Sequence, residues 1–133
     1  MTLSLPTAAK DVATKLPLCP NSPNCVSSQA ADSSHFIAPF KIKGKPEEAF
    51  AALKKALTEQ TRTVITEATD TTLHAEATSL LFRYVDDVYA LVDVDAGLIH
   101  IHSASRTGYS DFGVNRRRIE ALRTALQQHG AIE

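Results

Sequence analysis

The sequence of 133 residues lacks tryptophan and contains one methionine, two cysteines and five glycines. It also has no apolar run near the roughly 18 residues that a membrane-spanning helix requires. Residues 1–15 have neither the basic start nor the long apolar core of an export signal. As written, the chain is therefore expected in the cytoplasm, or in the periplasm or attached to a membrane if a leader has been removed.

No charge of one sign dominates, since 14 lysines and arginines oppose 15 aspartates and glutamates and give a formal net charge of −1. This balance favours neither nucleic acid nor a membrane as a partner. The distribution is nevertheless uneven, because all seven arginines lie at or after Arg62 and all seven lysines at or before Lys55. Four arginines lie between Arg116 and Arg123, which is compatible with a local anion-binding patch.

The length fits one domain, because a chain of this size can bury roughly two thirds of its unfolded surface. Residues 1–17 show no clear hydrophobic period and are expected to form a flexible N-terminal arm. The remaining pattern predicts a single domain over residues 18–130.

Hydrophobic periodicity predicts the order of the elements. Phe40 and Ile42 alternate with lysines, as in a short strand. Pro46 suits a first helical position, and apolar residues at helical spacing follow it to about Gln60. From residue 62 to residue 106 the period changes to two, with gaps too short for parallel crossovers, so the pattern predicts antiparallel hairpins.

A closing helix is predicted to about His129, because Ile119, Leu122 and Leu126 form one stripe. The full order is β-α-β-β-β-β-α, which is typical of an α+β domain. We expect an antiparallel sheet of about five strands with the helices covering one face. The register of the Tyr89–His102 hairpin is left open, since D-A-G allows either a two-residue turn or a bulged one.

Cys19 and Cys25 are the only cysteines, and C-P-N-S-P-N-C is rich in residues that favour a tight loop. In an oxidising compartment the two thiols would close a small ring, and in the cytosol they would stay reduced. A disulfide is favoured over zinc, because closed structural zinc sites use four ligands.

The stretch S-A-S-R-T-G-Y-S-D-F-G-V-N-R-R-R, residues 103–118, has the composition of a specialised strand-to-helix junction. Asp111 or Ser110 could cap the helix, and the free N–H groups of a helix start beside arginines form an anion site. On a helical projection Asn115 falls on the buried stripe, so its amide must find partners. The candidate ligand-binding residues are Ser103, Ser105, Arg106, Tyr109, Ser110, Asp111, Asn115, Arg116 and Arg118.

Carboxylates and histidines form the other candidate groups. Asp86 and Asp87 are adjacent on a predicted strand and point to opposite faces, so a structural pairing with Arg83 or Arg106 is favoured over catalysis. The pairs His74–Glu76 and His100–His102 each share a strand face. The sharpest metal hypothesis is therefore His74, Glu76 and His100, although short patterns of this kind are common without a metal.

Four ordered motifs carry a resemblance to a known family: C-P-N-S-P-N-C-V-S-S-Q at 19–29, H-A-E at 74–76, F-R-Y-V-D-D-V at 82–88 and the arginine-rich stretch at 103–123. Over residues 18 to about 126 the sequence resembles the family catalogued as domain of unknown function 1499. That family has no established activity, so the resemblance implies kinship and little chemistry. The residues expected to have a structural or supporting role at the site are Arg83, Asp86, Asp87, Gly108 and Gly113.

The sequence favours a non-catalytic binding or accessory domain that holds an anionic small molecule or a protein segment at the Ser103–Arg118 junction. This interpretation depends on the convergence of Arg106, Arg118, Asn115 and the helix start on one concavity. The alternatives are a metal-dependent hydrolase that uses His74, Glu76 and His100, and a structural domain with no ligand. No cofactor is predicted, and the sequence does not decide whether the protein is an enzyme.

Overall fold

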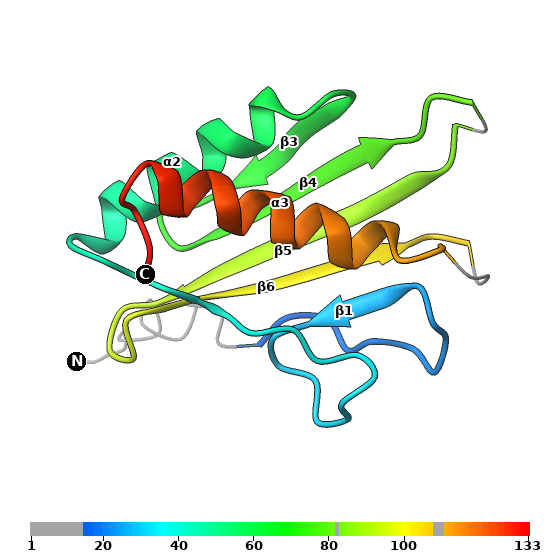
Figure 1. Ribbon diagram of the computed structural model, residues 1–133, viewed down its shortest axis with the longest axis horizontal. Helices are drawn as coiled ribbons and strands as arrows, with labels where there is room; N and C mark the ends of the chain where they lie inside the picture. The colour runs from blue at the N-terminus through cyan, green and yellow to red at the C-terminus, as the bar shows by residue number, and fades with distance from the viewer. Residues whose placement is uncertain (1–14, 82, 108–110) are drawn as a thin grey trace, which may run out of the picture.

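The computed structural model describes residues 15–81, 83–107 and 111–133. Most of the predicted arm lies outside the described residues, and so do the candidate residues Gly108, Tyr109 and Ser110. In the described part, two helices cover one face of a six-stranded antiparallel sheet (Figure 1). The elements are β1 (Cys25–Ser27), β2 (Phe40–Lys41), α2 (Pro46–Glu59), β3 (Thr63–Ala68), β4 (Thr72–Thr78), β5 (Val85–Asp93), β6 (Leu98–Ser105) and α3 (Val114–Gln128).

The strands follow the order β1-β6-β5-β4-β3, and β2 pairs with a second part of β6. This topology confirms the predicted α+β class and the β-α-β-β-β-β-α order. It adds β1, a strand that the hydrophobic periodicity did not predict. Cys25, Val26 and Ser27 are all buried, and they pair with residues 102–104 of β6.

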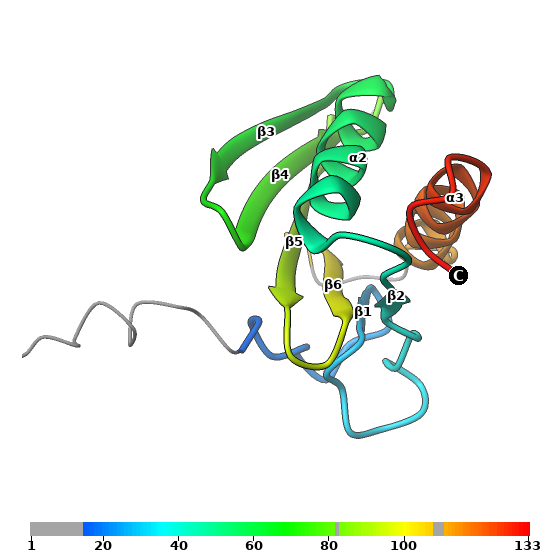
Figure 2. The ribbon, with the colours of Figure 1, turned by 90° about the vertical axis from the view of Figure 1, so that its left-hand side faces the viewer.

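Both helices form where local sequence and core packing agree. α2 begins at Pro46 with acidic residues in its first turn, and it buries Phe50, Leu53 and Leu57. α3 buries Ile119 and Leu122 against the sheet. Figure 2 shows the two helices on the same side of the sheet. None of the helices among the described residues combines the length and the apolar character needed to cross a membrane.

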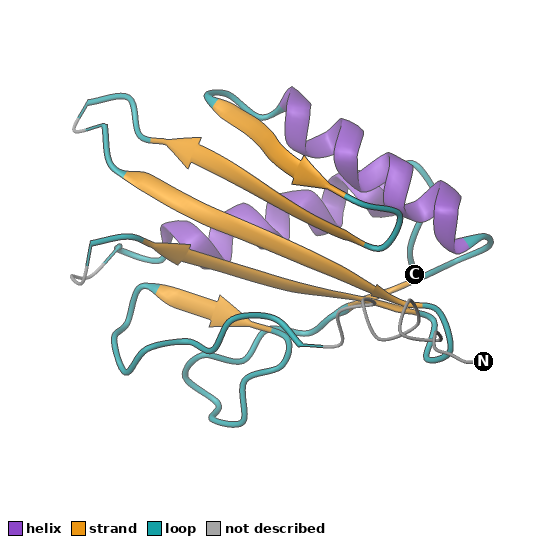
Figure 3. Cartoon of the chain, turned by 180° about the vertical axis from the view of Figure 1, so that it is seen from behind, coloured by secondary structure: helices purple, strands orange, loops and turns teal. Residues whose placement is uncertain are grey.

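The sheet has two different faces because side chains alternate along each strand. The helix-side face carries Val88 and Ile101, which are fully buried in the core. The other face carries His74, Tyr89 and His102, and we call it the open face because neither of the two helices in the described residues covers it (Figure 3). Burial of each large apolar side chain contributes about 1.5–3 kcal/mol, so the helix-side core is the main source of stability.

The hairpin between β5 and β6 has a register that the sequence left open. Val92 pairs with Ile99, and a four-residue turn ends at Gly97, whose φ of 69° lies in the left-handed region that glycine adopts easily. This register places His102 opposite Tyr89 and His100 opposite Leu91.

Candidate functional site

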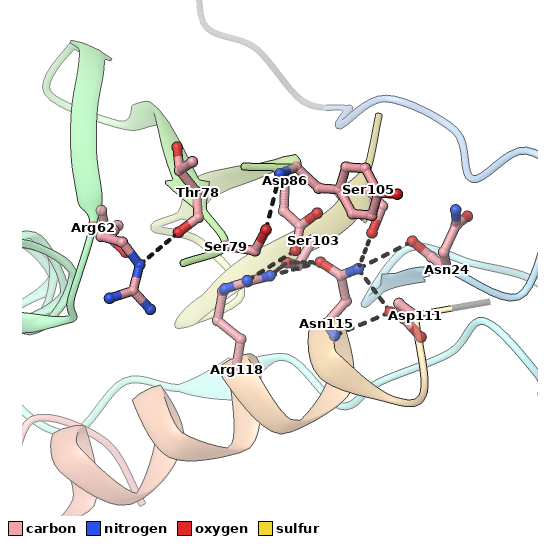
Figure 4. A network of polar contacts seen from close by, with 12 residues as sticks. Asn24, Arg62, Thr78, Ser79, Asp86, Ser103, Ser105, Asp111, Asn115 and Arg118 are labelled. Atoms are coloured by element: carbon pink, nitrogen blue, oxygen red, sulfur yellow. Dashed lines mark hydrogen bonds and ion pairs between the residues drawn. The ribbon is translucent and has the colours of Figure 1, made fainter. Parts of the chain in front are cut away.

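Arg118 lies at the centre of a polar network between α3 and the helix-side face of the sheet (Figure 4). Its Nη2 donates to Asp86 Oδ2 at 2.9 Å, and its Nη1 donates to Asn115 Oδ1 at 2.8 Å and to Ser103 Oγ at 3.1 Å. The side chains of Arg118 and Asp86 are only 13% and 11% exposed. The network is therefore a largely buried, charge-assisted pair with satisfied hydrogen bonds.

Asn115 joins this network to the end of β6. The side chain is fully buried, and its Oδ1 accepts a hydrogen bond of 2.6 Å from Ser103 Oγ. Its Nδ2 donates to Ser105 Oγ at 3.0 Å and to Asp111 Oδ2 at 2.8 Å. The amide on the buried stripe thus finds the partners that its burial requires.

Asp111 caps the start of α3, as the sequence suggested. Its Oδ1 accepts from the Gly113 backbone N–H at 2.8 Å, and its Oδ2 accepts from the Asn115 N–H at 3.1 Å. Burial raises the pKa of Asp111, but hydrogen bonds from Asn115 and Gly113 outweigh this effect and hold the pKa below its usual range. A carboxylate of the chain itself therefore takes the Asn115 N–H, one of the helix N–H groups that an external anion would use.

Asn24 was missed by the sequence reasoning, although it connects the cysteine loop to the junction. The side chain is 1% exposed, and its Nδ2 donates to the Thr107 carbonyl. Its own carbonyl accepts from the Ser105 N–H at 3.0 Å and from Asn115 Nδ2 at 3.2 Å. Asparagine before a cysteine in a tight loop carries no signal for such long-range contacts. Cys19 and Cys25 form a disulfide that closes this loop.

A pocket of about 430 Å³ lies beside the Arg118–Asp86 pair. We call it the arginine pocket, because Arg62 and Arg118 line opposite sides of it. Polar groups of Thr78 and Ser79 lie between the two arginines (Figure 4), and Leu80 and Val114 supply apolar lining.

Arg62 is the second residue that the sequence reasoning missed. Its Nε donates to the Thr78 carbonyl at 2.9 Å, while its two Nη groups donate to no described residue. Its φ of 53° is in the left-handed region, in the turn between α2 and β3. Such a turn is not evident from sequence, because arginine gives no preference for that conformation.

A second polar cluster lies on the open face, around His74 and Asp87. His74 Nε2 is 2.7 Å from Asp87 Oδ1, and His74 Nδ1 is 2.7 Å from Thr66 Oγ1. The imidazole stacks on the ring of Tyr89 with the centroids 4.5 Å apart. Both ring nitrogens of His74 therefore have partners, which fixes the orientation of the ring.

Arg106 binds both carboxylates of this cluster. Its Nε donates to Asp87 Oδ2 at 2.8 Å, and its Nη2 donates to Asp87 Oδ1 at 2.9 Å and to Glu76 Oε2 at 2.8 Å. Hydrogen bonds from Arg106, joined by one from His74 and partly opposed by burial, hold the pKa of Asp87 below its usual range. The same carboxylates raise the pKa of Arg106.

The structure does not assemble the predicted metal triad of His74, Glu76 and His100. His100 Nδ1 lies 2.9 Å from Ser28 Oγ, and the third group beside His74 and Glu76 is Asp87. The ligand atoms of His74, Glu76 and Asp87 lie within 4.8 Å of one another. Pairing of β4 with β5 causes this difference, because Glu76 stands opposite Asp87.

The expected convergence of Arg106 and Arg118 on one concavity is also wrong. Arg106 binds Asp87 on the open face, whereas Arg118 binds Asp86 on the helix-side face. The sheet separates the two guanidinium groups, because consecutive residues of a strand point to opposite faces. Asp86 thus pairs with Arg118 and not with Arg83 or Arg106, the partners predicted from the sequence.

The remaining candidate residues lie near the network without joining the arginine pocket. Arg116 donates to the carbonyls of Phe36 and Ser34, so it holds the connection between β1 and β2 against α3. Gly113 has a φ of 80° and permits the turn into α3. Arg83 pairs with no carboxylate among the described residues, and its φ of 58° lies in the left-handed region.

Fold and site together define an α+β domain in which two arginine–carboxylate systems, one largely buried and one partly exposed, lie on opposite faces of an antiparallel sheet. The family described as "Protein of unknown function (DUF1499)" matches residues 15–126, and the chain belongs to this family. The match confirms the resemblance drawn from the four motifs. A search of the curated proteins finds no match.

Proposed function

We propose that the protein is a non-catalytic binding domain that holds an anionic small molecule in the arginine pocket. The observation that carries this proposal is the placement of Arg62 and Arg118 on opposite sides of one pocket. Guanidinium groups recognise carboxylates and phosphates with paired hydrogen bonds. A volume of about 430 Å³ is within the range of small-molecule sites.

The charge balance in the pocket supports an anion. Asp86 neutralises one positive charge, but it takes only one Nη2 hydrogen bond from Arg118. The Nε of Arg118 donates to no described residue, and Arg62 lacks a carboxylate partner among the described residues. The pocket therefore keeps one uncompensated positive charge and several N–H donors that a carboxylate or phosphate would accept.

The lining supports binding without catalysis. The described lining residues include no histidine, cysteine or lysine, and the one carboxylate, Asp86, is engaged by Arg118. A general base needs a side chain able to take a proton within hydrogen-bonding reach of the ligand. The hydroxyl groups of Thr78 and Ser79 have no such base beside them in the pocket.

The alternative of a metal-dependent hydrolase is less well supported. His74, Glu76 and Asp87 could offer three ligand atoms, but Arg106 binds both carboxylates. A divalent ion would have to displace this guanidinium group and meet its repulsion. A structural domain with no ligand explains the Arg118–Asp86 network, but it leaves the two-sided placement of arginines around the pocket without a role.

The test is a thermal unfolding series with inorganic phosphate, phosphorylated metabolites and small di- and tricarboxylates. A ligand at about a hundred times its dissociation constant adds about 2.7 kcal/mol to the free energy of unfolding, which raises the midpoint by several degrees. Arg62→Gln should abolish most of this shift. Arg62 is preferred to Arg118 for the test, because loss of Arg118 would leave Asp86 buried without its partner.

Arg117→Gln is the matched control, since Arg117 is exposed and donates to the Phe112 carbonyl outside the pocket lining. This variant should keep the full shift. An anion-induced shift of equal size in Arg62→Gln would contradict the proposal, and so would a panel in which no anion raises the midpoint. A shift produced by divalent metals alone would favour the cluster on the open face.

A further inference from the structure

Exposed apolar side chains gather on two connections at one end of the sheet, the right-hand end in Figure 1. Leu80 and Leu81 in the β4–β5 connection are 69% and 79% exposed, and Phe112 before α3 is 84% exposed. Tyr84 and Val114 beside them are also exposed. We call these five residues the apolar tips. Exposed apolar side chains that cluster in this way mark an interaction surface more often than isolated ones do.

The same end of the molecule carries most of the arginines. Six of the seven arginines adjoin the β4–β5 connection, the α2–β3 turn or the start of α3, namely Arg62, Arg83, Arg106, Arg116, Arg117 and Arg118. Among the described residues, Arg106 and Arg118 are paired with carboxylates, while Arg62, Arg83 and Arg117 form no salt bridge. The six arginines at this end slightly outnumber the carboxylates of Glu59, Glu76, Asp86, Asp87 and Asp111, so the apolar tips lie beside a small excess of positive charge that the arginines without a salt bridge carry.

The opposite end differs in its composition. There the β5–β6 turn exposes Val94, and Lys43 and Lys45 lie before α2. Among the described residues, Val94 is a single exposed apolar residue at this end, which needs no special explanation. The two ends thus differ in the exposure of apolar side chains, although both carry basic residues. Substitutions at the opposite end can therefore serve as controls for substitutions in the apolar tips.

We propose that the arginine-rich end docks on the surface of a bilayer that contains anionic phospholipid. The apolar tips would enter the boundary between headgroups and acyl chains, and the arginines would bind lipid phosphates. Charge complementarity favours this occupant. The arrangement of the tips favours it as well, because they project from two separate connections, and a fluid lipid surface accepts separate projections without a matching groove.

The position of the arginine pocket agrees with this orientation. Leu80 and Val114 belong both to the apolar tips and to the pocket lining. A domain docked by its tips would therefore have the pocket beside the phosphate layer of the bilayer. The docking itself does not rest on the proposed function, since it requires the tips and the exposed arginines and not a ligand in the pocket.

The first experiment is co-sedimentation of the full chain with vesicles of phosphatidylcholine alone or mixed with phosphatidylglycerol. The protein should bind the mixed vesicles and bind the neutral ones weakly. The double variant Leu80→Ser, Leu81→Ser should bind about tenfold more weakly or worse, because two apolar side chains are lost from the interface. Val94→Ser, at a position 58% exposed at the opposite end, should bind like the natural chain.

The second experiment separates specific docking from general attraction between charges. Arg83→Gln with Arg117→Gln should weaken binding to anionic vesicles, whereas Lys43→Gln with Lys45→Gln removes two charges from the opposite end and should leave binding unchanged. Equal losses in the two double variants would overturn the proposal. Unfolding midpoints of all variants, measured alongside, identify any variant that binds weakly because it is unstable.

The two proposals fail independently. Absence of binding to anionic vesicles would overturn the docking, and a retained thermal shift with a soluble anion would then leave the pocket proposal standing. Vesicle binding that is only slightly weakened in Arg62→Gln, because Arg62 is one of several arginines at this end, together with loss of the soluble-anion shift, would support both. A serine double variant that still binds anionic vesicles fully would show that the apolar tips do not enter the bilayer.

Discussion

Asp86 and Asp87 are consecutive residues, and their carboxylates bind two different arginines on opposite faces of one sheet. Asp86 Oδ2 lies 2.9 Å from Arg118 Nη2 under the start of α3, and Asp87 Oδ2 lies 2.8 Å from Arg106 Nε on the open face. One peptide unit of β5 thus joins two polar systems that share no side chain. Each system can be altered while the other remains intact.

The first prediction compares the two carboxylates. Asp86→Asn should lower the free energy of unfolding by about 3 kcal/mol, because Arg118 would remain largely buried without an opposite charge. Asp87→Asn should cost less, because Arg106 on the open face keeps Glu76 and is reached by water. Urea unfolding of both variants measures the difference. A larger loss in Asp87→Asn would mean that the open-face cluster is the stronger support of the fold.

The second prediction concerns Asn115. Asn115→Leu keeps the side-chain volume but removes the hydrogen bonds that the amide makes with Ser103, Arg118 and Asp111. Each buried group left without a partner costs about 1–3 kcal/mol, so the loss in unfolding free energy should reach about 3 kcal/mol or more. Gln128→Leu is the control, since this amide is exposed on the last turn of α3 and should change the stability by no more than about 0.5 kcal/mol.

The third prediction uses two histidines whose titration has opposite effects on stability. Burial lowers the pKa of His102 below 6.5, so the unfolded chain binds a proton more readily than the folded one. Stability should therefore fall as the pH drops below 6.5, by at most about 1.4 kcal/mol per pH unit. His102→Gln should flatten this acid-side decrease in urea unfolding between about pH 8 and about pH 5.5.

His35 should show the reverse dependence. The Ser22 carbonyl and the Asp32 carboxylate raise the pKa of His35 above 6.5, so its contribution is complete below that pH and is lost as the pH rises through the raised value. His35→Gln should then be more destabilising at about pH 5.5 than at about pH 8. Equal losses at both values would show that His35 acts only through contacts that do not depend on its charge.

The fourth prediction concerns the Cys19–Cys25 disulfide. A ring this small constrains the unfolded chain only moderately, and its removal should cost about 2 kcal/mol. Cys19→Ser with Cys25→Ser should lower the midpoint of thermal unfolding, and a reducing agent should lower that of the natural chain alone. An effect of the reducing agent on the double serine variant would point to a cause other than this disulfide.

Local rules account for the parts of the site that lie within one element. Strand alternation separates Asp86 from Asp87, and helical periodicity places Asn115 on the buried stripe of α3, so both positions followed from the sequence. The bounds of both helices were likewise close to those predicted. Each of these features depends on residues that are only a few positions apart in the chain, and the hydrophobic pattern of the sequence reveals them.

Contacts between distant segments could not be obtained in this way. Arg106 follows the last residue of β6, where alternation no longer fixes the face to which a side chain turns. Asn24 reaches the junction only because β1 pairs with β6, and Arg62 lines the pocket only because a left-handed turn follows α2. The position of Asn24 depends on tertiary pairing, and that of Arg62 depends on a turn conformation for which arginine shows no preference, so a single sequence gives no local signal for either.

The pairing of β1 with β6 also governs when the domain can be completed during synthesis. Cys25 pairs with Ala104, so the ribosome releases β1 long before its partner exists. Such long-range pairings slow folding, because a large loop must close before the contact forms. β2 depends on β6 as well, through Phe40 and Ile99. Any fragment that ends before residue 98 would leave β1, β2 and one edge of β5 without a partner.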